Sequence, residues 1–395
     1  MKVLFLTHRL PYAPNRGDRI RAYYLMREMS RFAAVSLFSF VHDDDEAAQA
    51  GSVPFAHDVR TARVTTWRNA VSGAVRLASR RPLTHSLLDA PAAPSVLGAM
   101  VAASPPDVVV AFCSSMARLA MAPALTGYPM VLDMVDVDSA KWSQLAMGAH
   151  GPRRWIYRRE ALTLGAFERT AVQRARTTLV VNDRERRSLL EVAPDARAEV
   201  VENGVDLDAF VPPSPPAVDP IVVFCGVLNY YPNEEGVLWF ASDVWPRVRT
   251  VVPRARFIIV GAGASRAIED LAARDPSIEV VGRVPSVQPF LWKSAVSVAP
   301  LRVARGLQNK VLEALAAGLP VVVTPAVWNG LPPEAQSGCV WAEQASDFAE
   351  AVLQLLAKSP AERRAQASMA RLDQLTWSNR LSAVERILRD APLQA

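Results

Sequence analysis

The sequence has few of the features that mark secreted, membrane-spanning or metal-binding proteins. Its three cysteines, Cys113, Cys225 and Cys339, lie far apart, without metal-ligand spacing, and each sits in an apolar run. That is typical of buried thiols in a reducing compartment. No apolar window reaches the roughly 18 residues that a membrane span needs, and the apolar run at the N-terminus is too short for a signal peptide. We therefore expect a cytoplasmic protein.

Charge of one sign is not concentrated anywhere in the chain. The 44 Lys and Arg outnumber the 39 Asp and Glu by a formal charge of +5, and no basic block runs beyond a few residues. This argues against a nucleic-acid partner. A modest positive charge suits a phosphate-bearing substrate or an anionic membrane surface. At 395 residues the chain is too long for one ordinary core, so we expect two domains.

Short apolar runs alternate with longer amphipathic ones. We expect strands at residues 2–7, 34–41, 107–113, 130–136 and 177–182, and a strand leading into a turn at 198–206. The pattern restarts after residues 211–220, which hold five prolines, with strands at 221–226, 256–263, 278–284, 296–301 and 319–325. Such β-then-α units build a parallel sheet covered by helices on both faces.

The pattern thus predicts an α/β protein with two doubly wound lobes. The first lobe spans 1–210, a stiff proline-rich linker 211–220, and the second lobe 221–375. Residues 376–395 form a C-terminal helix, for which packing back on the first lobe is one option. Because ligands collect at the carboxyl ends of the strands in such sheets, we expect the site in a cleft between the lobes.

Residues 301–325 gather charge around the start of a helix. Gly306 can open a helix whose N-terminal amides and dipole favour a phosphate. Lys310 and Glu313 are three residues apart and share one face of that helix, where a diphosphate takes the cation and a hydroxyl pair takes the carboxylate. An exposed ion pair on a packed helix explains the same two residues without a ligand.

Several stretches resemble the retaining GT-B glycosyltransferases of the GT4 type, which move a sugar from a nucleotide diphosphate donor. One is "ENGVDLDAF" (202–210) at the junction of the lobes. In the second lobe they are "FCGVLNYYPNEEGVLWF" (224–240), residues 280–302 and the segment 301–325; in the first they are "LPYAPNRGDRIRAYYL" and "VDVDSAKW". The chain is most similar to a subgroup associated with bacterial exopolysaccharide gene clusters. The resemblance implies two Rossmann-like lobes facing across a cleft. It also implies retaining, metal-independent hexosyl transfer, with no cofactor besides the nucleotide diphosphate sugar as substrate.

The resemblance also implies roles in the donor lobe. Glu313 holds the ribose hydroxyls, while Arg302 and Lys310 neutralise the diphosphate as charge builds on the leaving phosphate. The other donor-binding candidates are Gly306, Asn203, Gly204, Gly226, Asn229 and Arg283. The Asn203–Gly204 corner is alternatively a structural turn, and Arg283 a surface arginine.

The donor lobe departs from the family pattern at two places. Arg305 stands where the family usually has a glutamate that contacts the transferred sugar. Either another residue orients the sugar, or donor choice is altered, or this subgroup never used that carboxylate. Asn229, Tyr230 and Asn233 stand where many relatives have an arginine and a lysine, so the phosphate charge falls more heavily on Arg302 and Lys310.

In the first lobe, the candidates follow two strands. The Gly17 amide meets the donor phosphates or the acceptor, and Asp18 and Arg19 face the acceptor; Asp18 is alternatively only a helix N-cap. Asp136 and Asp138 bind acceptor hydroxyls or stabilise the cationic sugar, and we take Asp136 as the catalytic member. Ordinary turn-forming carboxylates are the alternative.

Two first-lobe stretches, 67–82 and 151–167, mix Trp, Tyr and Arg with apolar residues. They suit peripheral docking on the anionic inner face of a membrane, or else they are solvated helix faces with arginine stems. The acceptor implied by the resemblance is a glycan, a lipid-linked sugar or a small molecule. Two rival functions remain: a sugar-nucleotide epimerase of the same architecture, and a catalytically degenerate protein that binds nucleotide sugar or a partner transferase.

Overall fold

The computed structural model describes residues 1–14, 17–65, 69, 79, 81–212, 218–304 and 308–391, with the backbone alone at 17 and 18. These residues form two compact units, one of Met1–Glu202 with Leu381–Ala395 and the other of Asn203–Arg380. The predicted first lobe extends further, to residue 210. The difference arises because residues 203–210 pack within the second unit: the Val205 amide donates to Leu375 O (2.8 Å) and Trp292 Nε1 donates to Phe210 O (2.8 Å).

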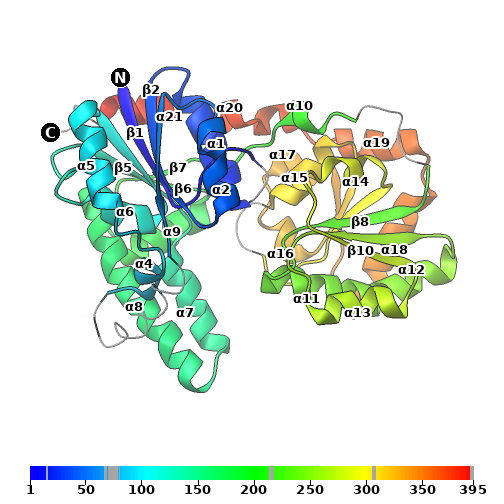
Figure 1. Ribbon diagram of the computed structural model, residues 1–395. Helices are drawn as coiled ribbons and strands as arrows, with labels where there is room; N and C mark the ends of the chain where they lie inside the picture. The colour runs from blue at the N-terminus through cyan, green and yellow to red at the C-terminus, as the bar shows by residue number, and fades with distance from the viewer. Residues whose placement is uncertain are drawn as a thin grey trace. The chain divides into compact units, whose positions relative to one another are not determined.

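The first unit is built on a seven-stranded sheet in the order β3-β2-β1-β4-β5-β6-β7, and the strands pair in parallel throughout (Figure 1). Its strands are β1 Lys2–Thr7, β2 Ala34–Val41, β3 Asp58–Arg63, β4 Val108–Phe112, β5 Met130–Val135, β6 Thr177–Val180 and β7 Ala198–Val200. Its helices are α1 Gly17–Met29, α2 Asp44–Ala48, α4 Leu83–Leu87, α5 Ala93–Ala103, α6 Ser114–Ala120, α7 Asp138–Gly148, α8 Gly151–Arg174, α9 Asp183–Val192 and α21 Val384–Asp390.

The second unit has a six-stranded parallel sheet in the order β10-β9-β8-β11-β12-β13. Its strands are β8 Ile221–Cys225, β9 Arg256–Val260, β10 Ile278–Gly282, β11 Val296–Ala299, β12 Val321–Val323 and β13 Cys339–Trp341. Its helices are α10 Leu207–Phe210, α11 Tyr231–Trp239, α12 Trp245–Val251, α13 Arg266–Arg274, α14 Gln288–Trp292, α15 Asn309–Ala316, α16 Pro325–Trp328, α17 Pro333–Gln336, α18 Ala345–Ala357, α19 Pro360–Ser368 and α20 Trp377–Arg380. A π-helical turn, Phe240–Val244, joins α11 to α12.

The central strands form where the sequence is continuously apolar. Strands β4 and β8 are buried at every position, which is what a parallel strand covered by helices on both faces requires. Each sheet reverses its strand order once, between β1 and β4 in the first unit and between β8 and β11 in the second. These reversal points are where a doubly wound sheet leaves a crevice at the carboxyl ends of its strands.

The last helix belongs to the first unit. The sequence predicted one C-terminal helix within residues 376–395, but α20 ends at Arg380 and α21 begins at Val384. Helix α21 buries Val384, Ile387 and Leu388. It contacts α1, and the Arg389 guanidinium lies 5.9 Å from the centre of the Phe32 ring.

Candidate functional site

A lysine and a carboxylate, Lys310 and Glu313, lie near each other at the strand reversal of the second unit. Lys310, at the start of α15, donates from Nζ to Asn233 Oδ1 (2.6 Å) and lies 4.6 Å from the centre of the Phe224 ring. Asn233 is fixed in turn, because its Nδ2 donates to Val227 O (2.7 Å). The ammonium is therefore held at the carboxyl end of β8 by residues from β8 and α11.

Gly226 leaves the space that this lysine uses. A Cβ atom at Gly226 would lie 2.9 Å from Lys310 Nζ and 3.0 Å from Asn233 Nδ2, closer than such contacts normally come. The glycine keeps the ammonium next to the exposed end of the strand. A phosphate at this corner would meet the lysine.

Burial displaces the pKa of both Lys310 and Glu313. Loss of water lowers the pKa of Lys310 to about 8, and it raises the pKa of Glu313 to about 7 although the nearby lysine acts against it. Within the described chain, the Glu313 carboxylate makes no hydrogen bond and no ion pair. A half-buried carboxylate without a donor partner is suited to accept hydrogen bonds from a ligand.

Arg302 is the second predicted cation and lies near the end of β11. Its side chain is 64% exposed and its Nη1 lies 3.2 Å from Glu235 Oε1, an exposed ion pair that constrains the arginine little. The preceding turn is held by a hydrogen bond from the Thr324 hydroxyl to Leu301 O. Gly306 and Arg305 lie outside the described residues.

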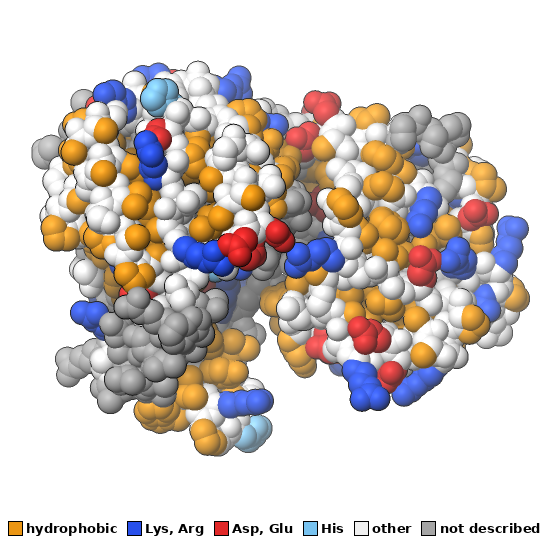
Figure 2. Space-filling view, viewed as in Figure 1, with side chains coloured by type: hydrophobic (Ala, Val, Ile, Leu, Met, Phe, Trp, Pro, Cys, Tyr) orange, Lys and Arg blue, Asp and Glu red, His pale blue; other side chains and the backbone are white. Residues whose placement is uncertain are grey.

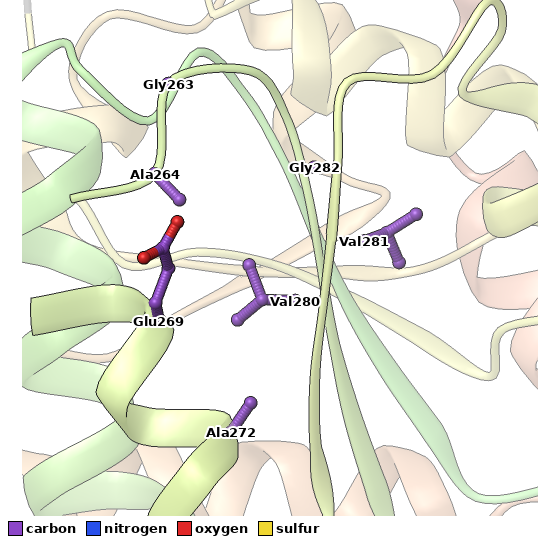
Figure 3. A pocket seen from close by; sticks show the side chains of 7 residues that line it. All are labelled: Gly263, Ala264, Glu269, Ala272, Val280, Val281 and Gly282. Atoms are coloured by element: carbon purple, nitrogen blue, oxygen red, sulfur yellow. The ribbon is translucent and has the colours of Figure 1, made fainter. Parts of the chain in front are cut away.

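A pocket of about 470 Å³ lies beside the ends of β9 and β10 (Figure 3). Glycines and valines line most of it, and Glu269 of α13 supplies its carboxylate; Val280 and Val281 point to opposite sides of β10 (Figure 3). Asn229 packs on its rim at Gly263. Arg283, exposed, directly follows the end of β10.

The Asn203–Gly204 corner has a clear structural role. A Cβ atom at Gly204 would lie 2.4 Å from the backbone nitrogen of Trp377, so only glycine fits. Val205 forms a parallel bridge with Thr376 at the same place. The segment around Gly204 and the segment around Thr376 are thus held together through their backbones.

The predicted carboxylates of the first unit lie together after β5. Lys141 Nζ lies 2.9 Å from Asp136 Oδ2 and 3.4 Å from Asp138 Oδ1, and Ser114 Oγ donates to Asp138 (2.9 Å). These three charged side chains are 30–41% exposed. Against the effect of burial, Asp138 and Asp136 raise the pKa of Lys141. The cluster presents two carboxylates bridged by one ammonium to solvent.

Strained backbone holds this cluster in place. Cys113 (φ 72°) follows β4 and Val135 (φ 63°) ends β5, and neither residue adopts such angles readily. Buried carboxylates fix the segment that follows β5. Glu185 accepts from the Val137 amide (2.9 Å), and Glu168 accepts from the Ser139 amide (3.1 Å) and hydroxyl. Burial raises the pKa of Glu168 to about 7.

The remaining first-unit candidates lie on α1. Gly17 is the first residue of that helix, and the side chain of Asp18 is outside the described part of the structure. Arg19 is buried: its Nη2 lies 2.9 Å from Glu46 Oε1 and its guanidinium stacks 4.6 Å from the centre of the Tyr12 ring. Arg19 thus holds α1 against α2 through Glu46.

Several partners of the candidate residues were not predicted from the sequence. Lys141 follows Asp138 at a spacing of three, which is a helical pairing distance. Glu168 and Phe224 gave no signal, because they reach their partners only through the folded sheet.

Comparisons with known proteins agree with this architecture. Residues 219–358 match the family described as Glycosyl transferases group 1, and no curated protein matches the chain. Sucrose-phosphate synthase from Thermosynechococcus elongatus is 15% identical over 100% of both chains, with a TM-score of 0.71. Anabaena Alr3699/HepE, solved with UDP-glucose, is 14% identical over 98% of this chain and 99% of that chain, with a TM-score of 0.67. A UDP-forming α,α-trehalose-phosphate synthase from Burkholderia xenovorans is 13% identical over 98% of this chain and 99% of that chain, with a TM-score of 0.64.

The likeness to these structures shows the GT-B fold, as predicted from the sequence. The match of residues 219–358 adds the class of the second unit: a group 1 glycosyltransferase domain within a chain that has the GT-B fold. Among the described residues, no helix is long and apolar enough to cross a bilayer. The same residues contain no group of three His, Cys, Asp or Glu placed to hold a metal ion.

Proposed function

We propose that this glycosyltransferase moves a hexose from a nucleotide diphosphate sugar to a hydroxyl acceptor with retention of configuration and without a metal ion. The observation that carries the proposal is the pair of Lys310 and Glu313 at a strand reversal: the ammonium is fixed by Asn233, and the carboxylate has no hydrogen-bond partner among the described residues. Charge-assisted hydrogen bonds to both groups would hold a diphosphate and a ribose at once.

The donor occupies the carboxyl edge of the second sheet in this proposal. Lys310 and the exposed Arg302 neutralise the diphosphate, and Arg302 exchanges Glu235 for phosphate as the donor enters. Glu313 accepts hydrogen bonds from the ribose hydroxyls. The base rests near the rim of the pocket in Figure 3, next to Asn229 and Arg283. Gly306, Asn203 and Gly204 remain donor candidates from the resemblance.

Leaving-group stabilisation is the main catalytic contribution that we infer. Negative charge grows on the β-phosphate as the glycosidic bond breaks, and Lys310 and Arg302 stabilise that charge. The departing phosphate takes the proton of the acceptor hydroxyl, which attacks from the same face. No cofactor is needed in this scheme.

The acceptor lies against the first unit in this proposal. The cluster of Asp136, Asp138 and Lys141 offers both hydrogen-bond acceptors and a cation to a polyhydroxylated molecule. Asp136 also stabilises the cationic sugar. Gly17 and Asp18 remain acceptor candidates from the resemblance, whereas the buried Arg19 supports α1 through its ion pair with Glu46. We place the product in exopolysaccharide or other glycoconjugate synthesis, as in the GT4 subgroup that the sequence resembles, at the inner face of a membrane.

Nucleotide binding tests the proposal directly. The full chain is titrated calorimetrically with UDP, GDP, ADP and dTDP and with their common sugar conjugates. We expect the nucleotides of one base to bind. Glu313→Ala and Lys310→Met should each lower the affinity for them by about tenfold to a hundredfold, because each removes hydrogen bonds that involve a charged group. Glu343→Ala and Lys293→Met, exposed residues of the same unit, serve as matched controls.

Product analysis then separates the rivals. Turnover that requires an added acceptor supports transfer, whereas conversion of the donor alone to a new sugar indicates an epimerase. If none of the nucleotides binds, the transferase proposal fails and a degenerate partner protein is favoured.

A further inference from the structure

Helices α7 and α8 form a hairpin that extends away from the sheet of the first unit (Figure 1). All five fully buried residues of α8 lie at or beyond Glu160, so its first nine residues are outside the core. In this part the packing is between the two helices, as in the contact of Trp142 with Tyr157 (ring centres 5.3 Å apart). The end of the hairpin is therefore a surface of its own.

Large apolar side chains are exposed on this end. Trp155 is 58% exposed and Leu162 75%; on α7, Leu145 is 51% and Met147 75% exposed. Trp155 and Leu162 are seven residues apart and so lie on one face of α8. Figure 2 shows hydrophobic side chains, with basic ones and a histidine, on this projection. Water-exposed apolar groups clustered in this way mark a contact surface.

The same surface is strongly basic. No Asp or Glu occurs between residues 139 and 159, whereas five Lys and Arg do. Lys141 is paired with the Asp136–Asp138 cluster and Arg159 with Glu160. Arg153, Arg154 and Arg158 are exposed and make no ion pair with any described residue. Arg158 lies between Trp155 and Leu162 on the helix face, so charge and apolar area are interleaved.

We propose that the end of this hairpin docks on an anionic phospholipid bilayer, with Arg153, Arg154 and Arg158 at the headgroups and Trp155 and Leu162 at the acyl boundary. Charge complementarity selects this occupant. A second copy of the chain would bring two unpaired basic surfaces together, whereas anionic lipids neutralise them and accept the apolar residues in the same contact. The inference does not rest on sugar transfer.

Vesicle flotation of the full chain tests the proposal. We expect binding to phosphatidylcholine vesicles that contain phosphatidylglycerol, and none to phosphatidylcholine alone. Raising the ionic strength from about 0.1 M to about 1 M shortens the screening length from about 10 Å to about 3 Å and should release the protein. The variant Arg153→Glu/Arg154→Glu/Arg158→Glu should lower the partition coefficient on the order of a hundredfold or more, about fivefold for each arginine lost.

A matched variant, Arg184→Glu/Arg187→Glu/Arg254→Glu, changes the net charge equally at exposed arginines elsewhere and should bind as the wild type does. Trp155→Ala/Leu162→Ala should lower binding about tenfold without changing its salt dependence. Nucleotide binding, measured on each variant, reports on the proposed transferase separately. Any of three results overturns the proposal. The wild type does not bind anionic vesicles, or both triple variants lose vesicle binding equally. The third is a wild-type dimer in solution that Trp155→Ala/Leu162→Ala dissociates while vesicle binding persists.

Discussion

Burial shifts the pKa values of Lys310 and Glu313 in opposite directions. Burial disfavours the charged form of each, so the pKa of the lysine falls to about 8 and that of the glutamate rises to about 7. Both groups are charged together only in the narrow interval between these values. A ligand that carries a diphosphate and two hydroxyls stabilises both charged forms, so binding should depend on pH.

We predict a bell-shaped pH dependence of donor affinity, with its maximum between about pH 7 and pH 8. As the pH falls through about 7, Glu313 takes up a proton and no longer accepts two hydroxyl hydrogens. As the pH rises through about 8, Lys310 loses its proton and its attraction for the diphosphate. Calorimetric titration with a nucleotide sugar measures this, because its esterified diphosphate does not titrate in the same range.

The variants separate the two limbs of that curve. Glu313→Gln should flatten the acid limb and leave the alkaline one, and Lys310→Met should do the reverse, each at lower overall affinity. An affinity that stays constant from pH 6 to pH 9 in the wild type would show that neither group meets the donor.

At the scale of elements, the segments around Gly204 and Trp377 hold the start and the end of the second unit together. The Val205 amide donates to Leu375 O, and the Gly204 backbone lies directly against the backbone of Trp377. Both partners are backbone atoms, which have little freedom to move aside. The corner therefore depends on the absence of one Cβ atom.

We predict that Gly204→Ala destabilises the second unit by about 3 kcal/mol or more, because a contact of 2.4 Å with Trp377 N forces the segments apart. Gly98→Ala is the matched control: Gly98 lies within α5, and a Cβ there meets nothing within 4 Å. That change should stabilise the first unit by about 0.5–1 kcal/mol. Urea unfolding of both variants measures the two effects, and equal effects would contradict the role given to the corner.

Most elements were readable from the sequence, and those that were missed share a cause. The buried strands can be predicted because each is an apolar run in the sequence, as in β4 and β8. Strand β3 has a mostly polar sequence, and β13 has only three residues, so neither produces such a run. Both are edge strands, exposed on one side, where burial imposes no apolar pattern.

The candidate site was predictable to the extent that it is local. Lys310 and Glu313 share one turn of helix, so their pairing follows from spacing. Asn233 holds Lys310 across 77 residues, and Glu168 supports Ser139 across 29, so both contacts depend on the tertiary fold. The strain at Cys113 and Val135 is likewise invisible in the sequence, because neither residue type favours a positive φ.

At the scale of the whole molecule, the two units have separate cores. The core cluster of the second unit runs from Val205 to Leu375 without a residue from outside. The first unit is discontinuous, since Leu381–Ala395 joins Met1–Glu202. The second unit therefore has a complete core in one stretch of chain, whereas the first needs the C-terminal helix.

We predict that residues 203–380, expressed alone, fold cooperatively and bind the donor nucleotide. In the proposed site the donor contacts of Lys310, Arg302 and Glu313 all come from this stretch. Calorimetric unfolding and nucleotide titration of the fragment measure both properties. A fragment that is unfolded, or folded but unable to bind, would show that the donor site needs the first unit.

The complementary truncation tests the other half of this division. A chain that ends at residue 380 keeps the second unit intact but loses Leu381, Val384, Ile387 and Leu388, all of them buried. Each such side chain contributes about 1.5–3 kcal/mol on burial, so the first unit should unfold at a much lower temperature. The nucleotide-stabilised transition of the second unit should stay where it is in the full chain. If both transitions move together in scanning calorimetry, the units do not unfold separately, and the independence argued from their cores is wrong.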